Sequence, residues 1–139
     1  MSEASTTVRP IRVLLVDDEP VVRLGVRMLL GLEPDILVVG EAGNGAEALS
    51  LVPTLRPDVV LLDLMMPGLD GLSVAGMLRT FAPWVAVVIL SLYDNCDVRA
   101  RAEAAGISGF VGKFEAGIAM LPAIRRAAVQ IHGQGMDDR

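Results

Sequence analysis

Acidic, hydroxyl and basic side chains follow four separate apolar stretches of this sequence. Asp17 and Asp18 come after the first apolar stretch, Asp63 after the third, Ser91 after the fourth and Lys113 after the fifth. An ionised carboxylate beside an apolar stretch is costly unless it is paired or lies at a rim, so Asp63 needs a partner. If the three acids meet, they form a site suited to a hard divalent cation.

Repulsion between neighbouring carboxylates explains why such a site would take a cation. Two carboxylates about 4 Å apart repel by roughly 4 kcal/mol at an effective dielectric near 20. Mg²⁺ relieves this repulsion, prefers oxygen ligands and is often bound together with a phosphate oxygen. Lys113 could then neutralise one phosphoryl oxygen, and Ser91 could donate a hydrogen bond to another. In this interpretation Asp63 is the nucleophile and its product is an acyl phosphate.

Most of these residues also have a simpler interpretation. Asp17 or Asp18 could cap the helix that follows, since acids favour that position. Ser91 could be a turn residue, and Lys113 could be a solvated loop lysine. Asp63 is harder to explain in this way, because it closes the apolar run Val59-Val60-Leu61-Leu62.

Composition narrows the classes of function further. A single cysteine, Cys96, cannot form an intrachain disulfide. The single histidine, His132, lies in the predicted C-terminal tail, which nearly excludes a Ser-His-Asp triad and excludes a histidine-rich metal site. The formal charge of -5 gives no general electrostatic footprint for nucleic acid. The first ten residues contain Glu3 and no apolar run, and a charge and a proline interrupt the apolar segment 71–93. We therefore predict a cytoplasmic domain that binds neither nucleic acid nor membrane directly.

Short runs of valine, isoleucine and leucine alternate with helical segments along the 139 residues. The runs are continuous, which is typical of parallel strands covered on both faces. The predicted strands are Ile11–Val16, Ile36–Gly40, Asp58–Leu62, Val85–Leu90 and Gly109–Gly112. The predicted helices are Pro20–Leu30, Asn44–Leu51, Gly71–Thr80, Asn95–Ala105 and Ile118–Ile131. Right-handed crossovers then predict a flavodoxin-like α/β fold, a doubly wound five-stranded parallel sheet in order 2-1-3-4-5 with helices on both faces.

That strand order places the first and third strands side by side. Ligands bind outside the carboxyl ends of such strands, so we expect Asp17, Asp18 and Asp63 to line one crevice. The predicted domain covers residues 11–131, with tails at 1–10 and 132–139. Pro122 lies where the last helix should already be established, so this helix is expected to start near Met120 or to be kinked.

Four motifs occur in order along the chain: Val13-Leu-Leu-Val-Asp-Asp-Glu-Pro20, Asp63-Leu-Met-Met-Pro-Gly-Leu-Asp-Gly71, Ile89-Leu-Ser91 and Gly109-Phe-Val-Gly-Lys113. Together they resemble the receiver domain of bacterial two-component response regulators, over about residues 11–131. The resemblance implies that Asp63 accepts a phosphoryl group from a sensor histidine kinase. Such a domain is a signalling phosphoacceptor and not an enzyme in the usual sense, although it assists its own phosphorylation and dephosphorylation.

The same resemblance implies roles for the surrounding residues. Asp18, Asp63 and the backbone carbonyl of Met65 would bind Mg²⁺, and Asp17 would contribute mostly through water. Ser91 and Phe110 would be switch residues that respond to phosphorylation.

Three further segments are most similar to receivers of the NarL/LuxR group: Arg12-Val-Leu-Leu-Val-Asp-Asp, Gly40-Glu-Ala-Gly-Asn-Gly and Ala104-Ala-Gly-Ile-Ser-Gly. Receivers of this group normally precede a helix-turn-helix DNA-binding domain and control transcription. The eight residues that follow Ile131 in this sequence are too few for us to expect such a domain among them. The sequence therefore fits either part of a transcription regulator, with a homodimer formed on phosphorylation, or a stand-alone receiver that acts through protein contacts or as a phosphate shuttle. It does not identify the cognate kinase or the signal.

Three rival interpretations remain at this stage. The segment Gly43-Asn-Gly45-Ala-Glu-Ala48 matches a dinucleotide-binding fingerprint, but it follows the second strand, and a capped turn is simpler. A phosphohydrolase with an aspartate nucleophile would want another acid where Met65 stands. A degenerate receiver would serve only as an interaction module. Within the receiver interpretation, Tyr93 is large enough to obstruct an attacking water, which predicts slow autodephosphorylation.

Overall fold

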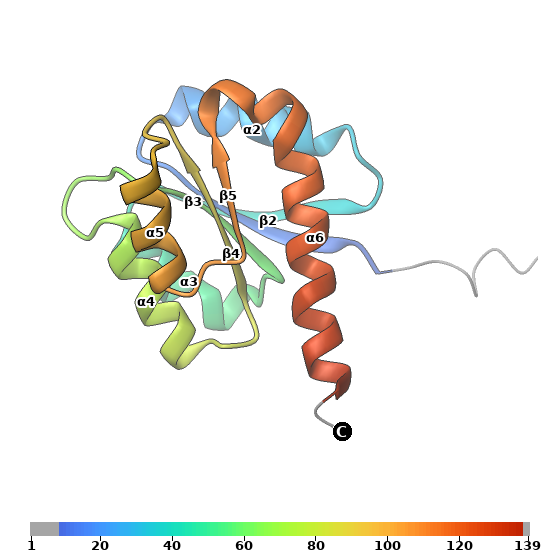
Figure 1. The fold of residues 1–139 in the computed structure, drawn as a ribbon. Coiled ribbons are helices and arrows are strands. Elements are labelled where there is room, and N and C mark those ends of the chain that lie inside the picture. Colours follow the sequence, from blue (N-terminus) through green and yellow to red (C-terminus); the bar gives the residue numbers. More distant parts are fainter. Residues whose placement is uncertain (1–8, 138–139) are drawn as a thin grey trace, which may run out of the picture.

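A five-stranded parallel sheet forms the centre of the molecule in a computed structural model that describes the backbone of residues 9–137 (Figure 1). The strands are β1 (Ile11–Val16), β2 (Ile36–Ala42), β3 (Val59–Asp63), β4 (Ala86–Ser91) and β5 (Gly109–Gly112). The α-helices are α2 (Pro20–Gly31), α3 (Gly45–Leu55), α4 (Gly71–Phe81), α5 (Cys96–Ala104) and α6 (Ala116–Asp137). A 3-10 turn, η1 (Lys113–Glu115), precedes α6. The strand order β2-β1-β3-β4-β5 confirms the predicted doubly wound topology.

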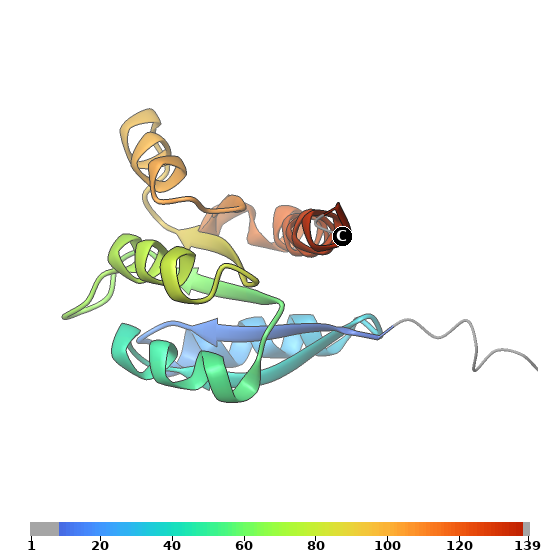
Figure 2. The same cartoon turned by 90° about the horizontal axis from the view of Figure 1, so that it is seen from below.

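Both faces of the sheet are buried, because helices cover it on both sides. Successive residues of a strand point to opposite faces, so Leu14 and Val60 lie in one core while Val13 and Val59 lie in the other. Helices α3 and α4 complete the first core, and α2 and α6 complete the second. Figure 2 shows α3, α4 and α5 side by side. This double burial is the reason for the continuous apolar runs in the sequence.

Helix α5 contributes little to the cores. Of its nine residues only Ala102 is buried, and its sequence is mostly charged or small. The helix is nevertheless capped, because the Asn95 side chain accepts a hydrogen bond from the backbone N–H of Val98 at 2.9 Å. The cap, one buried alanine and the partly buried Val98 therefore hold this helix with little apolar packing.

The glycine-containing turn before α3 is closed by its own side chains. Asn44 accepts a hydrogen bond from the backbone N–H of Glu47, and the Glu47 carboxylate accepts one from the backbone N–H of Gly43, each at 2.8 Å. These two bonds resemble a capping box, except that the Glu47 carboxylate bonds the residue before the N-cap Asn44. The pattern supports the capped-turn interpretation of this segment over a dinucleotide-binding loop.

The start and end of α6 differ from the prediction. The helix begins at Ala116 and not near Met120, and Pro122 lies inside it. Proline lacks the N–H that would have bonded the carbonyl of Ile118, and its ring crowds that carbonyl. Pro122 is exposed and Ile118 is 86% exposed, so this side of the helix faces water, which can serve that carbonyl. On the opposite side, Met120 and Ile124 are buried in the second core. Their burial stabilises the helical turns on either side of Pro122.

The predicted tails are only partly outside the fold. The Arg9 guanidinium pairs with the Asp58 carboxylate at 3.0 Å, while residues 1–8 lie outside the described residues. Helix α6 continues to Asp137, beyond the predicted helix end at Ile131, and extends past the sheet (Figure 1). Among the helices of residues 9–137, none has both the length and the apolar character needed to cross a membrane.

Gly71 allows α4 to begin against the loop that follows β3. Its backbone N–H donates to the Leu64 carbonyl at 3.0 Å. A Cβ at this position would lie 2.5 Å from the Asp63 carbonyl oxygen and 2.8 Å from Leu64 Cα, both backbone atoms that cannot move independently. The absence of a side chain at Gly71 therefore fixes the path of the chain just after Asp63.

We expect Gly71→Ala to lower the free energy of unfolding by about 2 kcal/mol or more, because the methyl group displaces backbone. Gly76→Ala, in the same helix, is the matched control, since a Cβ there meets nothing within 4 Å. That change should be neutral or stabilise by up to about 1 kcal/mol. Urea unfolding followed by the fluorescence of Trp84, the single tryptophan, measures both. Equal effects of the two changes would contradict the close-contact argument.

Candidate metal and phosphoryl site

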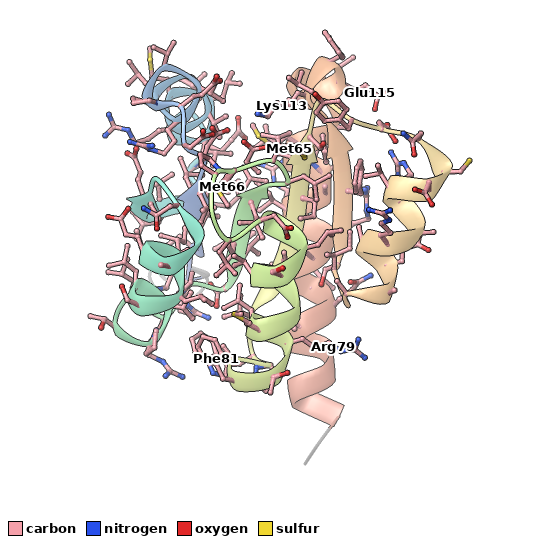
Figure 3. The ribbon with its side chains drawn as sticks, turned by 90° about the vertical axis from the view of Figure 1, so that its left-hand side faces the viewer. Met65, Met66, Arg79, Phe81, Lys113 and Glu115 are labelled. Carbon is pink, nitrogen blue, oxygen red and sulfur yellow. The ribbon has the colours of Figure 1, made fainter. Side chains whose placement is uncertain are left out.

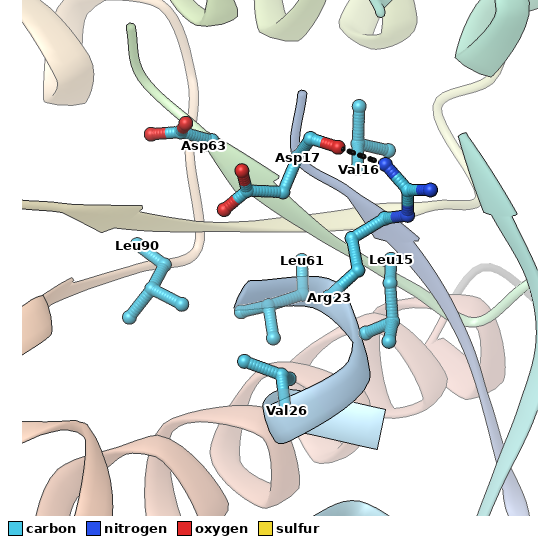
Figure 4. Close-up of a pocket in the computed structure, with 8 residues that line it drawn as sticks. All are labelled: Leu15, Val16, Asp17, Arg23, Val26, Leu61, Asp63 and Leu90. Carbon is cyan, nitrogen blue, oxygen red and sulfur yellow. Dashed lines mark hydrogen bonds between the residues drawn. The ribbon is translucent and has the colours of Figure 1, made fainter. Parts of the chain in front are cut away.

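Two buried aspartates meet at the carboxyl edge of the sheet because β1 and β3 are paired in matching register. Val16 lies opposite Leu62, so the residues that follow them, Asp17 just after β1 and Asp63 at the end of β3, lie at the same level of this edge. Each of these aspartates is only 6% exposed. Figure 4 shows their carboxylates side by side above the sheet. The strand order therefore brings Asp17 and Asp63 together, as the sequence predicted.

Asp18 completes a cluster of three carboxylates. One carboxylate oxygen from each of Asp17, Asp18 and Asp63 lies within 4.8 Å of the others. Asp18 is the most exposed of the three, so the cluster opens to solvent on its side. Oxygens at this spacing need only small side-chain rotations to share one Mg²⁺, whose ligands lie at about 2.1 Å. The donor set, all oxygen and all acidic, fits a hard divalent cation.

Lys113 is the cationic member of the site. Its Nζ lies 3.3 Å from Asp17 Oδ2 and 3.5 Å from Asp63 Oδ1, although the three residues are far apart in sequence. The lysine side chain is 16% exposed, so both contacts are partly desolvated. Figure 3 shows Lys113 and Met65 at the same end of the sheet. One lysine cannot neutralise three carboxylates, so the site keeps an excess of negative charge.

Burial raises the pKa of Asp63 to about 6, and repulsion from the Asp17 carboxylate adds to this effect. Lys113 and a hydrogen bond from the backbone N–H of Met65, at 3.3 Å, act in the opposite direction. Attraction to one ammonium group therefore does not offset desolvation and the neighbouring acid. At neutral pH Asp63 is largely ionised, as a nucleophile or a metal ligand must be.

Met65 has its side chain 58% exposed and its backbone next to the Asp63 carboxylate. The observed contact is its N–H, which donates to Asp63 Oδ1. The expectation that the Met65 carbonyl binds a metal remains a prediction.

Ser91 and Phe110 lie on the next two strands. Asp63 pairs with Leu90, so Ser91 follows one position further along β4, fully buried, and its Oγ accepts a hydrogen bond from the backbone N–H of Tyr93 at 2.9 Å. Phe110 pairs with Ile89 across β4 and β5 and is partly buried. Phe110 is not part of the acidic cluster. Its ring is instead covered by Arg99 of α5, whose guanidinium carbon lies 4.6 Å from the ring centroid.

Sequence reasoning missed two residues that support the site. Arg23 of α2 donates from Nη1 to the backbone carbonyl of Asp17 at 2.6 Å, and from Nε to Glu41 of β2 at 3.1 Å (Figure 4). The available signal was an arginine within the apolar segment Val21-Val22-Arg23-Leu24, partly buried in the fold. Below the acids, Arg23 also lines a cavity of about 10 Å³, which is room for about one water.

Asp63→Asn should stabilise the protein at neutral pH in the absence of divalent cations. The folded-state pKa of Asp63, about 6, lies above its ordinary value of 3.8, so the ionised group destabilises the folded state above pH 6. This destabilisation is relieved as the pH falls from 6 towards 4. We expect a gain on the order of 1 kcal/mol at pH 7.5, allowing for solvent screening.

Thermal unfolding in EDTA between pH 4.5 and 8 measures this effect. The difference between wild type and Asp63→Asn should shrink as the pH falls. A constant difference across the range would show that the charge of Asp63 is not its source.

The fold and this edge of the sheet define the chain as a response regulator receiver: residues 13–125 match the response regulator receiver domain family, and the chain belongs to it. Within the family it is a receiver of the NarL/LuxR type. It is 38% identical to the nitrate/nitrite response regulator NarL of Escherichia coli over 119 residues, which are 86% of this chain and 55% of NarL. It is 40% identical to the DNA-binding transcriptional activator DevR/DosR of Mycobacterium tuberculosis over 115 residues, which are 83% of this chain and 53% of that protein.

A solved structure shows the same fold. The signal receiver domain of NarL from Mycobacterium tuberculosis superposes with a TM-score of 0.77 at 37% identity, covering 85% of this chain and 98% of that one. The present chain spans about half the length of the curated relatives it matches. The comparisons therefore confirm the receiver resemblance and its NarL/LuxR grouping.

Proposed function

We propose that this domain receives a phosphoryl group on Asp63 from a sensor histidine kinase. The observation that supports the proposal is the convergence of three carboxylates and one lysine at the switch point of the sheet, with Lys113 Nζ 3.5 Å from Asp63 Oδ1. The function of the relatives agrees with it, since NarL and DevR/DosR are named as regulators. An interaction module without phosphate chemistry would have no use for this costly arrangement of charge.

Asp63 acts as the nucleophile in the proposed transfer. One Oδ attacks the phosphorus of a phosphohistidine, a P–O bond forms, and the P–N bond breaks with its electron pair going to the imidazole. Lys113 is already poised beside Asp63 and stabilises negative charge on the transferred group. Ser91 donates its hydroxyl hydrogen to a phosphoryl oxygen, while its Oγ still accepts from Tyr93.

The acidic cluster would hold Mg²⁺, through Asp17, Asp18, Asp63 and the Met65 carbonyl. When bound, this ion neutralises charge on the phosphoryl group and on the acids. Asp17 and Asp18 orient the ion, and Asp63 is the group that is modified.

Phosphorylation would act outward through Ser91 and Phe110. A phosphoryl group adds about -1.5 to -2 charge and three acceptor oxygens, which draw in the Ser91 hydroxyl and the Lys113 ammonium. Inward movement of Phe110 would alter the surface near β5. In the intact protein, which we place in the cytoplasm, this change would favour a homodimer and control transcription through a helix-turn-helix domain.

Incubation with acetyl phosphate and Mg²⁺ tests the phosphoacceptor. Intact-mass measurement should show one added phosphoryl group on the wild type and none on Asp63→Asn. Asp70→Asn is the matched control, because it also removes one acid but keeps the hydrogen bond that caps α4. It should be modified like the wild type. Modification of Asp63→Asn to the wild-type extent would refute the assignment.

Tyr93→Ala should shorten the lifetime of the phosphorylated state. Tyr93 follows Ser91 by two residues and is 56% exposed, so its ring can shield the phosphoryl group from an attacking water. We expect the phosphate half-life to fall by about threefold or more, since water access limits hydrolysis. Leu92→Ala, at the exposed residue beside it, is the control. The idea is wrong if both variants lose phosphate at the wild-type rate.

A further inference from the structure

The backbone of Asp17 is held on both sides at the point where β1 ends. Its N–H donates to the Ala42 carbonyl of β2 at 3.1 Å, and its carbonyl accepts from Arg23 Nη1 at 2.6 Å. Its side chain is also engaged, by the backbone N–H of Glu19 at Oδ1 and by Lys113 at Oδ2. Among these four attachments, only that of Arg23 ties the acidic loop to the body of α2 (Figure 4).

Arg23 is itself fixed by a second partner. Its Nε lies 3.1 Å from Glu41 Oε1, and the other oxygen of the same carboxylate lies 3.1 Å from Nε of Arg27, one helical turn further along α2. Arg23 is the more buried of the two arginines, with a side chain 20% exposed against 52% for Arg27. Both arginines therefore bind Glu41, but it is Arg23 that also bonds the acidic loop, through the Asp17 carbonyl.

Repulsion within the cluster makes such a restraint necessary. The carboxylates of Asp17, Asp18 and Asp63 lie close together with one lysine between them, so the loop carrying the first two is driven away from the third. A guanidinium can bond a carbonyl and a carboxylate at once through its planar donors, whereas an ammonium is a compact point donor on a flexible stem. Arg23 meets this requirement by linking Glu41 to the Asp17 carbonyl.

We propose that Arg23 is a positioning residue of the metal site, which holds the Asp17 carbonyl so that Asp17 and Asp18 stay within reach of an ion shared with Asp63. This inference rests on the proposed function, because it assumes that the acids bind Mg²⁺. Arg23 acts through the backbone of a ligand residue and does not touch the ion itself. Groups that orient metal ligands in this way commonly change metal affinity by about 10–100-fold when they are lost.

The Mg²⁺ affinities of Arg23→Gln and Arg27→Gln, measured by isothermal titration calorimetry, test this role. Both changes remove one positive charge from α2 and one bond to Glu41, but only the first removes the bond to Asp17. Loss of a positive charge by itself strengthens cation binding, so weaker binding reports on position and not on charge. We expect Mg²⁺ to bind Arg23→Gln about tenfold more weakly than wild type, and Arg27→Gln to stay within about twofold.

Arg23→Lys and thermal unfolding in EDTA complete the experiment. Arg23→Lys keeps the charge without the planar two-way contact, so its affinity should lie close to that of Arg23→Gln. If Arg23→Lys restores wild-type affinity, or if Arg23→Gln and Arg27→Gln bind alike, the inference is overturned. Unfolding temperatures in EDTA show whether each variant is folded at the temperature of the titration. A wild type that binds no Mg²⁺ would instead refute the proposed function.

Discussion

Mutual repulsion between Asp17 and Asp63 is the constraint around which this molecule is organised. The two carboxylates are almost fully buried at the ends of adjacent strands, where the pairing of β1 with β3 brings them together. Lys113 relieves part of the repulsion, yet the pKa of Asp63 remains raised to about 6. The folded protein therefore keeps an arrangement that a cation or a change of charge at Asp63 can relax. This is the property required of a site whose state is to be altered by chemistry.

The rest of the fold resists that repulsion. Two apolar cores, one on each face of the sheet, fix the register of β1 against β3. The close approach of Gly71 to the backbone of Asp63 and Leu64 fixes the loop after β3, and Arg23 with Ala42 fixes the end of β1. Apolar burial thus supplies the stability that keeps the repelling carboxylates together at one edge of the sheet.

Local apolar runs predicted the strands, and the usual strand order of a doubly wound sheet then predicted the acidic cluster. Continuous apolar runs mark buried parallel strands, and the residues after them must meet where neighbouring strands end. The predicted start of α6 was wrong. Pro122 suggested that the helix would begin later, but burial of Met120 and Ile124 on the far side stabilises it from Ala116 onward. Arg23 was missed because its partner is a backbone carbonyl, which every residue has and no sequence pattern marks.

Helix α5, unlike the acidic edge of the sheet, is held by few buried contacts. It buries only Ala102, and Arg99 covers Phe110 while its Nε and Nη2 bind the Asp94 carboxylate. Substitutions on most of its surface would leave both cores intact. The outer face of α5 can therefore vary in sequence, and so in what it contacts, without disturbing either core or the acidic edge of the sheet.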